Sequence, residues 1–217
     1  MKKFELTNEF ITNMFGTKLF RIRALVEFGD VEAGELGGYV EKESNLGHDD
    51  NAWVYGDARV YDNARVYDNA RVYGDAQVSG DARVYDNARV YGDAWVYGDA
   101  RVYDNALVCG NARVYDNARV YGDAWVYGNA RVCGDALVCG DARVCGNGDY
   151  AYAHGFGSVN RTTTFFRLKD GGVGVRCGCF YGTLAQFRDK IRETHGETKK
   201  AQEYLMLADL MKLRFEK

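Results

Sequence analysis

The side chains with the clearest chemical potential in this sequence are arginines and tyrosines that recur at a fixed spacing. Two sets repeat every eighteen residues: Arg65, Arg83, Arg101 and Arg119 form the first, and Tyr67, Tyr85, Tyr103 and Tyr121 form the second. Guanidinium groups bind phosphate or carboxylate through paired hydrogen bonds, and phenol rings add stacking and cation–π contacts. Side by side on one surface, the two sets would form a binding site for an anionic partner.

The same arginines also have a simpler explanation. Between residues 52 and 147 the chain has ten arginines and thirteen aspartates, and it has no lysine or glutamate there. The arginines would then neutralise the aspartates as a charge ladder on the surface, because surface charge pairs are common and individually weak. The sequence alone favours this charge ladder over a binding site.

Residues typical of catalytic and metal sites are few. His48 precedes the repeats and His154 follows them, and at such ends histidine is more often a packing residue than a general base. The Cys-Gly-Cys motif at 177–179 has only His195 near it, so we expect a strand with one thiol on each face and not a zinc site. We therefore expect no catalytic residue, no metal and no cofactor.

A repeat of six residues must position the arginines and tyrosines. Sixteen valines recur at every sixth position from Val54 to Val144, each within a variant of Gly/Asp-Asp/Asn-Ala-x-Val-Tyr. So strict a period marks a solenoid whose units share one core. Alternation along a short strand points each valine inward and its neighbours outward, and the Gly, Asp and Asn pairs tolerate tight turns. Three six-residue sides close a coil of eighteen residues, so residues eighteen apart should stack in columns.

This pattern is typical of a left-handed parallel β-helix. It resembles the hexapeptide-repeat superfamily, in which an aliphatic residue follows a small residue by two positions, as in 58–60, Ala-Arg-Val. Acyltransferases of this superfamily typically build their site from a histidine near a subunit boundary and a loop that interrupts the coils. The resemblance therefore implies that these two features should be sought here. The coils here contain neither feature. Nor do they supply the histidine cluster of a zinc carbonic anhydrase or the threonine arrays of an ice-binding protein.

Three regions can be drawn around the repeats. Residues 1–51 should form an N-terminal cap with a strand at 18–25, and Val40 and Leu46 should add an irregular first coil because they too are six residues apart. Residues 52–156 should form the β-helix. Its last coil should be closed by Tyr150 and Phe156, which keep the sixfold spacing.

Residues 157–217 should form a small C-terminal ββαα module, which consists of a β-hairpin followed by two helices. Two strands at 162–168 and 173–180 flank Lys-Asp-Gly-Gly, which indicates a β-hairpin. Thr183 should begin a helix that ends at the dipeptide His195-Gly196, and a second helix should run from about 198 to 215 with a broad apolar stripe.

The six cysteines do not suggest disulfides. Cys133, Cys139 and Cys145 fall on three different sides of the coil, while Cys109 shares a side with Cys145 but lies two strand spacings away, about 9.6 Å. We expect reduced surface thiols. The formal net charge of −3 gives no general case for nucleic-acid or membrane binding, and no signal peptide is visible, so we expect a cytoplasmic protein.

Outward apolar residues suggest self-association. Trp53, Trp95, Leu107 and Trp125 stand at outward positions of the coils, and a monomer would leave that apolar surface in water. We expect these four residues to form an oligomer interface, with a trimer favoured over a dimer.

The two ends of the chain carry a second resemblance. The segments 19–25, 34–41, 45–46 and 51–55 resemble the opening of hexapeptide-repeat proteins from bacteriophages and prophages, and 177–184 with 194–196 is similar to a tail module attached to many of them. The resemblance implies no catalytic residue. It leads us to expect a non-enzymatic binding protein that blocks or sequesters a host defence protein or its nucleotide signal. A transferase with a site at a subunit interface and a purely structural assembly module are the alternatives.

Overall fold

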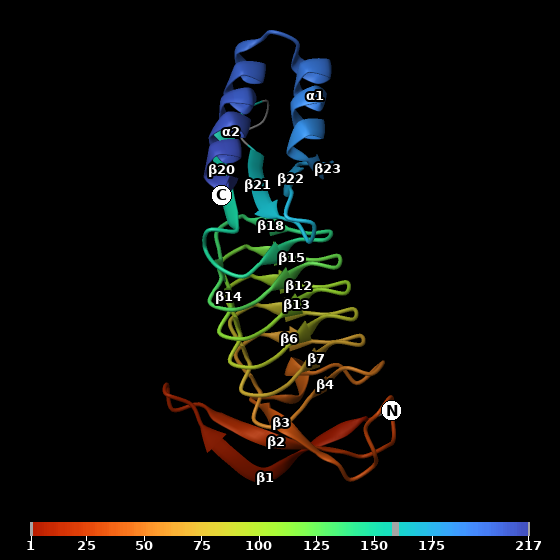
Figure 1. Cartoon of the computed structure of the whole chain (residues 1–217). Coiled ribbons are helices and arrows are strands. Elements are labelled where there is room, and N and C mark those ends of the chain that lie inside the picture. The colour runs from red at the N-terminus through yellow and green to blue at the C-terminus, as the bar shows by residue number, and fades with distance from the viewer. Residues whose placement is uncertain (1, 158–160, 217) are drawn as a thin grey trace.

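The computed structural model describes residues 2–157 and 161–216 and shows a rod of stacked coils between two caps (Figure 1). Each coil contributes two-residue strands to three sheets, and the repeat valines face inward with no exposed surface. Strands eighteen residues apart pair in parallel, with Val84 opposite Val102 and Val102 opposite Val120. The predicted parallel β-helix with eighteen residues per coil is therefore confirmed.

The three sheets form the three sides of the rod, which we number in order to describe its surface. Side 1 contains β5 (Arg59–Val60), β8 (Gln77–Val78), β11 (Trp95–Val96), β14 (Arg113–Val114) and β17 (Arg131–Val132). Side 2 contains β4 (Trp53–Val54), β7 (Arg71–Val72), β10 (Arg89–Val90), β13 (Leu107–Val108), β16 (Trp125–Val126) and β19 (Arg143–Val144). Side 3 contains β6 (Arg65–Val66), β9 (Arg83–Val84), β12 (Arg101–Val102), β15 (Arg119–Val120) and β18 (Leu137–Val138).

The corners between the sides turn at residues with positive φ. At every corner from residue 56 to residue 140 the first residue is glycine or aspartate, with φ between 55° and 72°. This conformation costs a non-glycine residue about 1–2 kcal/mol. The aspartates offset that cost by accepting backbone hydrogen bonds from the next coil. Asp104 Oδ2 accepts from the N–H of Gly122 (3.0 Å), and Asp116 Oδ2 accepts from the N–H of Gly134 (3.1 Å).

The N-terminal cap is a three-stranded sheet that continues into side 1. β1 (Phe4–Thr12), β2 (Lys18–Ala24) and β3 (Leu36–Val40) are antiparallel, and β3 then pairs in parallel with β5. Val40 lies opposite Val60, and after the short helix η1 (Glu43–Asn45) Leu46 lies opposite Val66. These two residues form the irregular first coil that their spacing predicts, and β2 occupies the strand predicted at 18–25.

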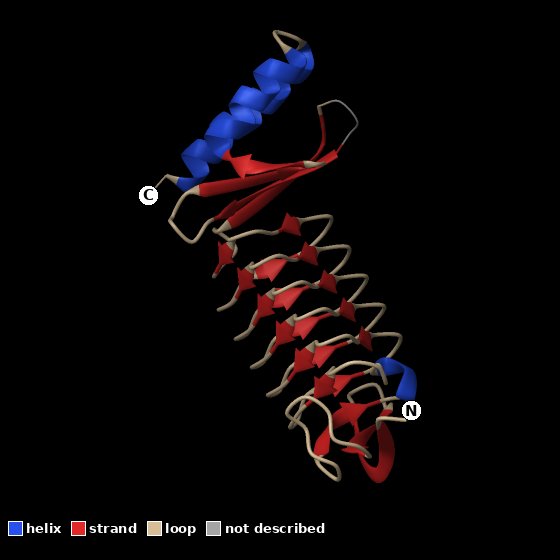
Figure 2. Ribbon diagram, turned by 90° about the vertical axis from the view of Figure 1, so that its right-hand side faces the viewer, coloured by secondary structure: helices blue, strands red, loops and turns tan. Residues whose placement is uncertain are grey.

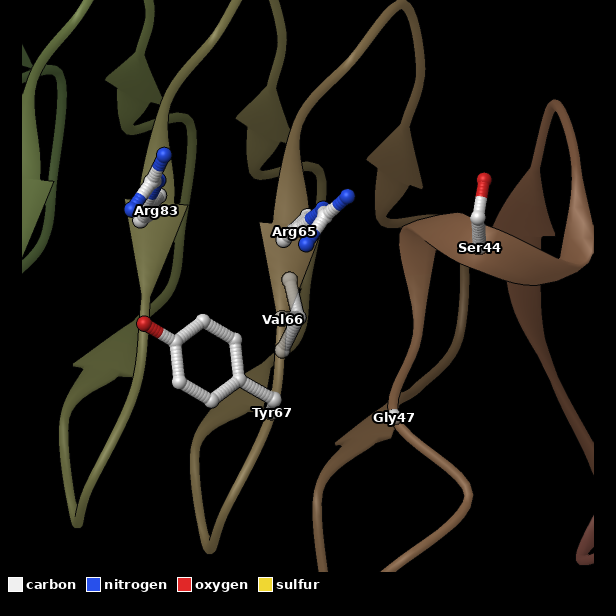
Figure 3. A pocket seen from close by; sticks show the side chains of 6 residues that line it. All are labelled: Ser44, Gly47, Arg65, Val66, Tyr67 and Arg83. Carbon is white, nitrogen blue, oxygen red and sulfur yellow. The ribbon is translucent and has the colours of Figure 1, made fainter.

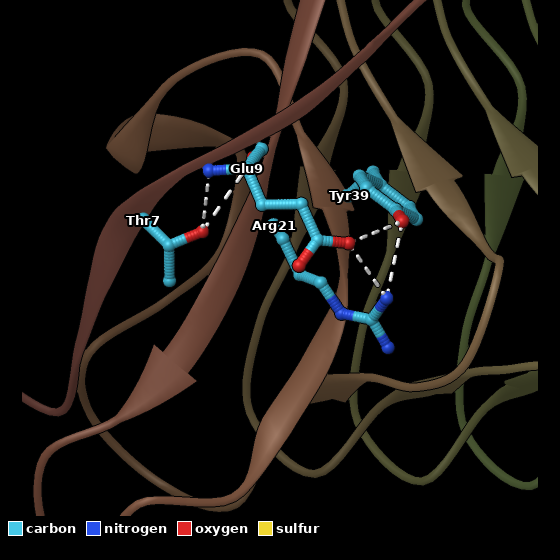
Figure 4. A network of polar contacts seen from close by, with 4 residues as sticks. All are labelled: Thr7, Glu9, Arg21 and Tyr39. Atoms are coloured by element: carbon cyan, nitrogen blue, oxygen red, sulfur yellow. Dashed lines mark hydrogen bonds and ion pairs between the residues drawn. The ribbon is translucent and has the colours of Figure 1, made fainter.

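A polar network ties the three cap strands together (Figure 4). Arg21 Nη1 donates to Glu9 Oε1 (3.0 Å) and to the Tyr39 hydroxyl (3.1 Å), and that hydroxyl donates to Glu9 Oε1 (3.1 Å). Thr7 Oγ1 accepts from the N–H of Glu9 (3.2 Å). The hydrogen bond to Glu9 raises the pKa of Arg21, so the guanidinium stays charged and fixed. The network therefore links all three strands of the cap.

The C-terminal module is an antiparallel sheet with a helical hairpin on one face (Figure 2). The sheet contains β20 (Tyr150–Phe156), β21 (Arg161–Arg167), β22 (Val173–Cys177) and β23 (Phe180–Thr183), and the helices are α1 (Leu184–His195) and α2 (Lys199–Phe215). Thr183 caps α1 by accepting from the N–H of Gln186 (3.3 Å), and Gly196 ends it. The predicted hairpin and both helices are confirmed. No helix in the described part of the chain is long and apolar enough to span a membrane.

The segment Tyr150–Phe156 differs from our expectation that it closes the last coil. It forms β20, the edge strand of the C-terminal sheet, because pairing with β21 satisfies the backbone groups of an extended seven-residue strand. Tyr150 is buried in the solenoid core together with Phe166, whereas Phe156 is exposed. Thr164 Oγ1 accepts from the N–H of Leu137 (2.9 Å). The sheet thus covers the open end of the rod and protects its edge.

Candidate functional site

The predicted arginine set lies in one column on side 3. The strands β6, β9, β12 and β15 pair in register, and this places one arginine of the set directly opposite the next in successive coils: Arg65, Arg83, Arg101 and Arg119. Three of the four are exposed, and Arg101 is half-buried. Because neighbouring strands are about 4.8 Å apart, the column is a closely spaced row of positive charge.

The tyrosine set forms a continuous stack beside this row. The ring centroids of Tyr67, Tyr85, Tyr103 and Tyr121 are 5.0, 5.0 and 4.9 Å apart in turn, and successive rings are parallel to within 3°. Burial between neighbouring rings raises the pKa of Tyr67, Tyr85 and Tyr103. The phenols therefore stay neutral near pH 7 and do not offset the neighbouring charge. We call these four arginines and four tyrosines the arginine–tyrosine face.

The arginines of this face form no direct ion pairs with the corner aspartates. Within residues 2–157 and 161–216, none of the four has an ion-pair partner, and the one arginine of the repeats that does is Arg71, which binds Asp30 of the cap (2.8 Å). The expected charge ladder is therefore not seen as direct pairing of these arginines. Some corner carboxylates, such as those of Asp104 and Asp116, instead accept backbone N–H groups of the next coil.

The N-terminal end of the face is hollowed. A cavity of about 370 Å³ is lined by Ser44, Gly47, Arg65, Val66, Tyr67 and Arg83, next to the short helix η1 (Figure 3). Gly47 lies against the backbone and Cβ of Tyr67, and a side chain there would crowd that residue. Two guanidinium groups, one phenol and one hydroxyl thus line a single recess, a donor set that suits phosphate or carboxylate.

The C-terminal end of the face meets the C-terminal module. Leu137 takes the place of the next arginine in the column, opposite Arg119. Arg119 and Arg161 of β21, together with the acidic Asp135, line a cavity of about 290 Å³ at this junction. The guanidinium of Arg176 lies over the ring of Tyr121, 6.0 Å from its centroid. Cations of the module therefore extend the positive surface beyond the last coil.

The expected oligomer interface does not form one patch. Trp53 is fully buried, because Phe4 and Phe28 of the N-terminal region pack against its ring at 6.2 and 5.3 Å. Trp95 lies on side 1, whereas Trp125 lies on side 2. Placing Trp53 on the outer surface was therefore wrong, since the cap that covers it is distant in sequence.

The remaining two residues of that set do lie together. Leu107 and Trp125 are opposite one another on side 2, and Trp125 is 43% exposed. The guanidinium of Arg143 covers part of the Trp125 ring at 4.4 Å, and Arg113 lies over Trp95 at 5.1 Å. These two guanidinium groups reduce the exposed apolar surface of sides 1 and 2. Self-association remains a prediction.

The two histidines nearest the coils lie in the caps. His48 stacks on Phe4 with centroids 4.5 Å apart, and its Nδ1 accepts from the N–H of Lys3 (3.2 Å). Burial lowers the pKa of His48. His154 Nδ1 lies 2.9 Å from Thr162 Oγ1 in the C-terminal sheet. Both rings have packing and hydrogen-bonding partners, and neither lies among the described residues that line the cavities at the two ends of the arginine–tyrosine face.

The cysteines are all free, as the sequence predicts. Cys139 is buried, however, because the C-terminal module covers it, and burial raises the pKa of its thiol. The motif 177–179 is a hairpin turn and not a strand with one thiol on each face, since Gly178 has a φ of 58° between β22 and β23. Among the described residues, no three His, Cys, Asp or Glu side chains gather as a metal site.

One cavity was not predicted from the sequence. It has a volume of about 200 Å³, lies within the C-terminal module, and is lined by residues that include Arg161, Cys177, Phe180, His195 and Tyr204. The motifs at 177–184 and 194–196 were the available signal. Their spacing could not show that the hairpin turn and the end of α1 meet at one cavity.

The comparisons with known proteins agree with this architecture. Six segments match the family model described as YdcK Beta solenoid repeat, namely 64–80, 76–87, 82–98, 94–110, 100–114 and 112–128. All six lie within the coils, so they cover less than half of the chain, and they include the whole arginine–tyrosine face. No curated protein matches the chain at a significant level. Fold and repeats together define a β-solenoid repeat protein, and its repeats are similar to the YdcK repeat.

Proposed function

We propose that this chain is a non-enzymatic binding protein of phage or prophage origin that holds an anionic host partner on the arginine–tyrosine face. The observation that carries the proposal is the row of four arginines without ion-pair partners among the described residues, next to a neutral tyrosine stack. Guanidinium groups that no carboxylate engages directly keep their paired donors available, and a closely spaced row of them attracts an anion.

The energetics of the row favour a ligand with several negative charges. Like charges about 4.8 Å apart repel one another by about 0.9 kcal/mol per adjacent pair in water. An anion that bridges two guanidinium groups removes this repulsion and gains charge-assisted hydrogen bonds. The recess at Arg65 and Arg83 gives such an anion a defined position at one end of the row.

The partner class that fits best is a nucleotide signal or an acidic host protein. Phosphate groups and carboxylates both match the planar guanidinium fork, and phenol hydroxyls add neutral donors. Sequestration needs a rigid surface and no reacting group. The half-buried tyrosine stack and the backbone ladder of the coils supply that rigidity.

The test replaces two central arginines of the row and compares them with a matched pair elsewhere. The double variant Arg83→Glu, Arg101→Glu changes the face, while Arg89→Glu, Arg131→Glu makes the same charge change on sides 2 and 1. Arg89 and Arg131 are exposed and, within the described residues, have no ion pair. Binding is measured by calorimetry against nucleoside triphosphates and cyclic dinucleotides, and by capture of host proteins from infected bacteria.

We expect the face variant to lose binding by at least about a hundredfold and the matched variant to lose less than about tenfold. Both should keep their melting temperature within a few degrees, because exposed charges contribute about 0 to 1 kcal/mol each. Equal losses in the two variants would reject a specific face. Acyl or sugar-nucleotide transfer that disappears in His48→Ala or His154→Ala would instead support the transferase alternative.

A further inference from the structure

A second candidate site lies in the C-terminal module. Its open cavity of about 200 Å³ is bordered by the turn between β22 and β23, by α1 and by α2. Phe180 comes from β23, Phe187 and His195 come from α1, and Tyr204 comes from α2. Segments that are separate in the sequence thus converge on one recess, which is the usual construction of a small-molecule site.

Aromatic rings form the walls of this cavity and hold one another in place. The Phe180 and Phe187 centroids are 5.4 Å apart, and Phe187 meets Tyr204 edge to face at 5.8 Å. His195 stacks on Tyr204 at 5.9 Å with an interplanar angle of 27°. Phe187 and Tyr204 are almost fully buried, so the walls are rigid before any ligand binds. Flat apolar bodies gain most from such walls, because offset stacking and edge contacts add to apolar burial.

The polar groups of the cavity differ in whether they already have an interaction partner. Lys190 is occupied by Glu193, which lies 2.9 Å away. The thiol of Cys177 accepts from Thr163 Oγ1 (3.1 Å) and donates to the Tyr204 hydroxyl (3.8 Å), so its position is fixed by two hydrogen bonds. Arg161 is exposed and has no ion-pair or hydrogen-bond partner within residues 2–157 and 161–216 for its side chain. One uncompensated cation therefore stands at an aromatic recess.

The turn at Gly178 brings that cation to the recess. Gly178 has a φ of 58°, and a Cβ at this position would collide with the guanidinium of Arg161. The missing side chain thus lets the guanidinium lie directly against the turn that carries Cys177 and Cys179. A guanidinium in this place presents its paired donors to a carboxylate whose attached group occupies the cavity.

We propose that this cavity binds a compound with a flat aromatic body of one or two rings and a single carboxylate, with the rings against the wall formed by Phe180, Phe187, Tyr204 and His195 and the carboxylate on Arg161. The volume limits the body to that size, and one free cation matches one negative charge. The same chemistry occurs in a free aromatic acid and in the aromatic C-terminal residue of a peptide. Arg161 also lines the junction cavity at the C-terminal end of the arginine–tyrosine face, so the two sites adjoin at this residue, while the aromatic walls belong to the C-terminal module.

The test compares an acid with its neutral isostere. Indole-3-acetate and indole-3-acetamide share the ring system and differ in the carboxylate, and their binding to the full chain is measured by saturation-transfer NMR and calorimetry. We expect the acid to bind at least about tenfold more tightly than the amide, because only the acid pairs with the guanidinium. Equal affinities, or no binding by the acid at millimolar concentration, would overturn the proposal.

Two further measurements locate the binding. Arg161→Gln should abolish the preference for the acid, whereas Arg192→Gln should keep it, since Arg192 is an exposed α1 residue that pairs with Asp189. The acid should also slow alkylation of Cys177 by iodoacetamide, followed by peptide mass spectrometry, and leave the exposed Cys145 unchanged. Acid preference that survives in Arg161→Gln, or unchanged alkylation of Cys177, would place the binding elsewhere and reject this site.

Two additional measurements distinguish a free acid from a peptide terminus as the ligand and separate this proposal from the one for the arginine–tyrosine face. A peptide with a free C-terminal tryptophan that binds at least about tenfold more tightly than indole-3-acetate would identify a peptide terminus. The reverse order would identify a free acid, and both orders support the site. Arg83→Glu, Arg101→Glu should leave indole-3-acetate binding unchanged, so failure of one proposal does not decide the other.

Discussion

Truncation of two tryptophans on the same side of the rod tests how the N-terminal cap works. Trp53 in β4 and Trp125 in β16 occupy equivalent repeat positions, yet Trp53 is fully buried and Trp125 is 43% exposed. The variants Trp53→Ala and Trp125→Ala therefore remove the same atoms from different surroundings. The sequence repeat makes them equivalent, and only the cap makes them different.

The expected costs follow from the contacts of each ring. Trp53 packs edge to face on Phe4 and Phe28, and removing such a buried ring typically costs about 3–5 kcal/mol. Trp125 has a partly exposed ring and one cation–π contact with Arg143, which is worth about 0.5–1 kcal/mol at an exposed site. We expect a total cost of about 1–2 kcal/mol for Trp125→Ala, and thus a difference of about 2–3 kcal/mol between the variants.

Urea denaturation and amide hydrogen exchange measure this difference. Denaturation gives the free energy of unfolding, and exchange in β1, β2 and β3 shows whether the cap opens by itself in Trp53→Ala, because repeat proteins can unfold locally. Trp53→Phe is the matched control: it keeps an aromatic ring and removes an indole N–H that has no hydrogen-bond partner among the described residues. We expect it to cost less than half as much as Trp53→Ala.

Light scattering adds a test of the alternative role of Trp53. If the ring lay in an oligomer interface, Trp53→Ala would lower the molar mass and change stability only through dissociation. We expect lower stability at unchanged mass. Equal costs for Trp53→Ala and Trp125→Ala, with unchanged exchange in the cap, would refute the reasoning that the cap buries the first coil.

Three further predictions concern the coils themselves. Val102→Asp should abolish soluble folded protein in expression assays, because an unpaired charge inside the stack costs several kcal/mol, whereas Tyr103→Ser should lose two ring contacts and about 1–3 kcal/mol in thermal melts. Asp104→Gly should be about 1 kcal/mol more stable than Asp104→Ala in urea denaturation, since both lose the hydrogen bond from Gly122 but only alanine keeps the cost of positive φ. Burial raises the pKa of Tyr55 to about 12. The stability that the neutral Tyr55 phenol contributes is therefore complete below the ordinary tyrosine pKa of about 10 and is lost as the pH rises to about 12. Ultraviolet titration of tyrosinate and denaturation across this pH range check the sign.

Several features were predictable because they depend on neighbours in the sequence. The sixfold valine spacing determines which side chains face inward, and the eighteen-residue coil then determines which residues share a column, as Arg83 and Arg101 do. Thr183 and Gly196 marked the ends of α1 for the same reason, since caps act within one turn of a helix. Periodicity and local turn chemistry therefore determined the rod, its columns and the helices.

Other features depend on segments that meet only after folding. The repeat cannot distinguish Trp53 from Trp125, because burial of Trp53 requires Phe4 and Phe28 from the cap. Composition suggested that arginines and aspartates would pair, but the coil geometry directs carboxylates such as Asp104 to backbone N–H groups of the next coil, and the arginine row has no direct ion pair among the described residues. The aromatic cavity likewise requires α1, α2 and a hairpin turn to converge. Sequence alone determined the scaffold of this protein, and tertiary contacts decided which of its charges and rings remain available to a partner.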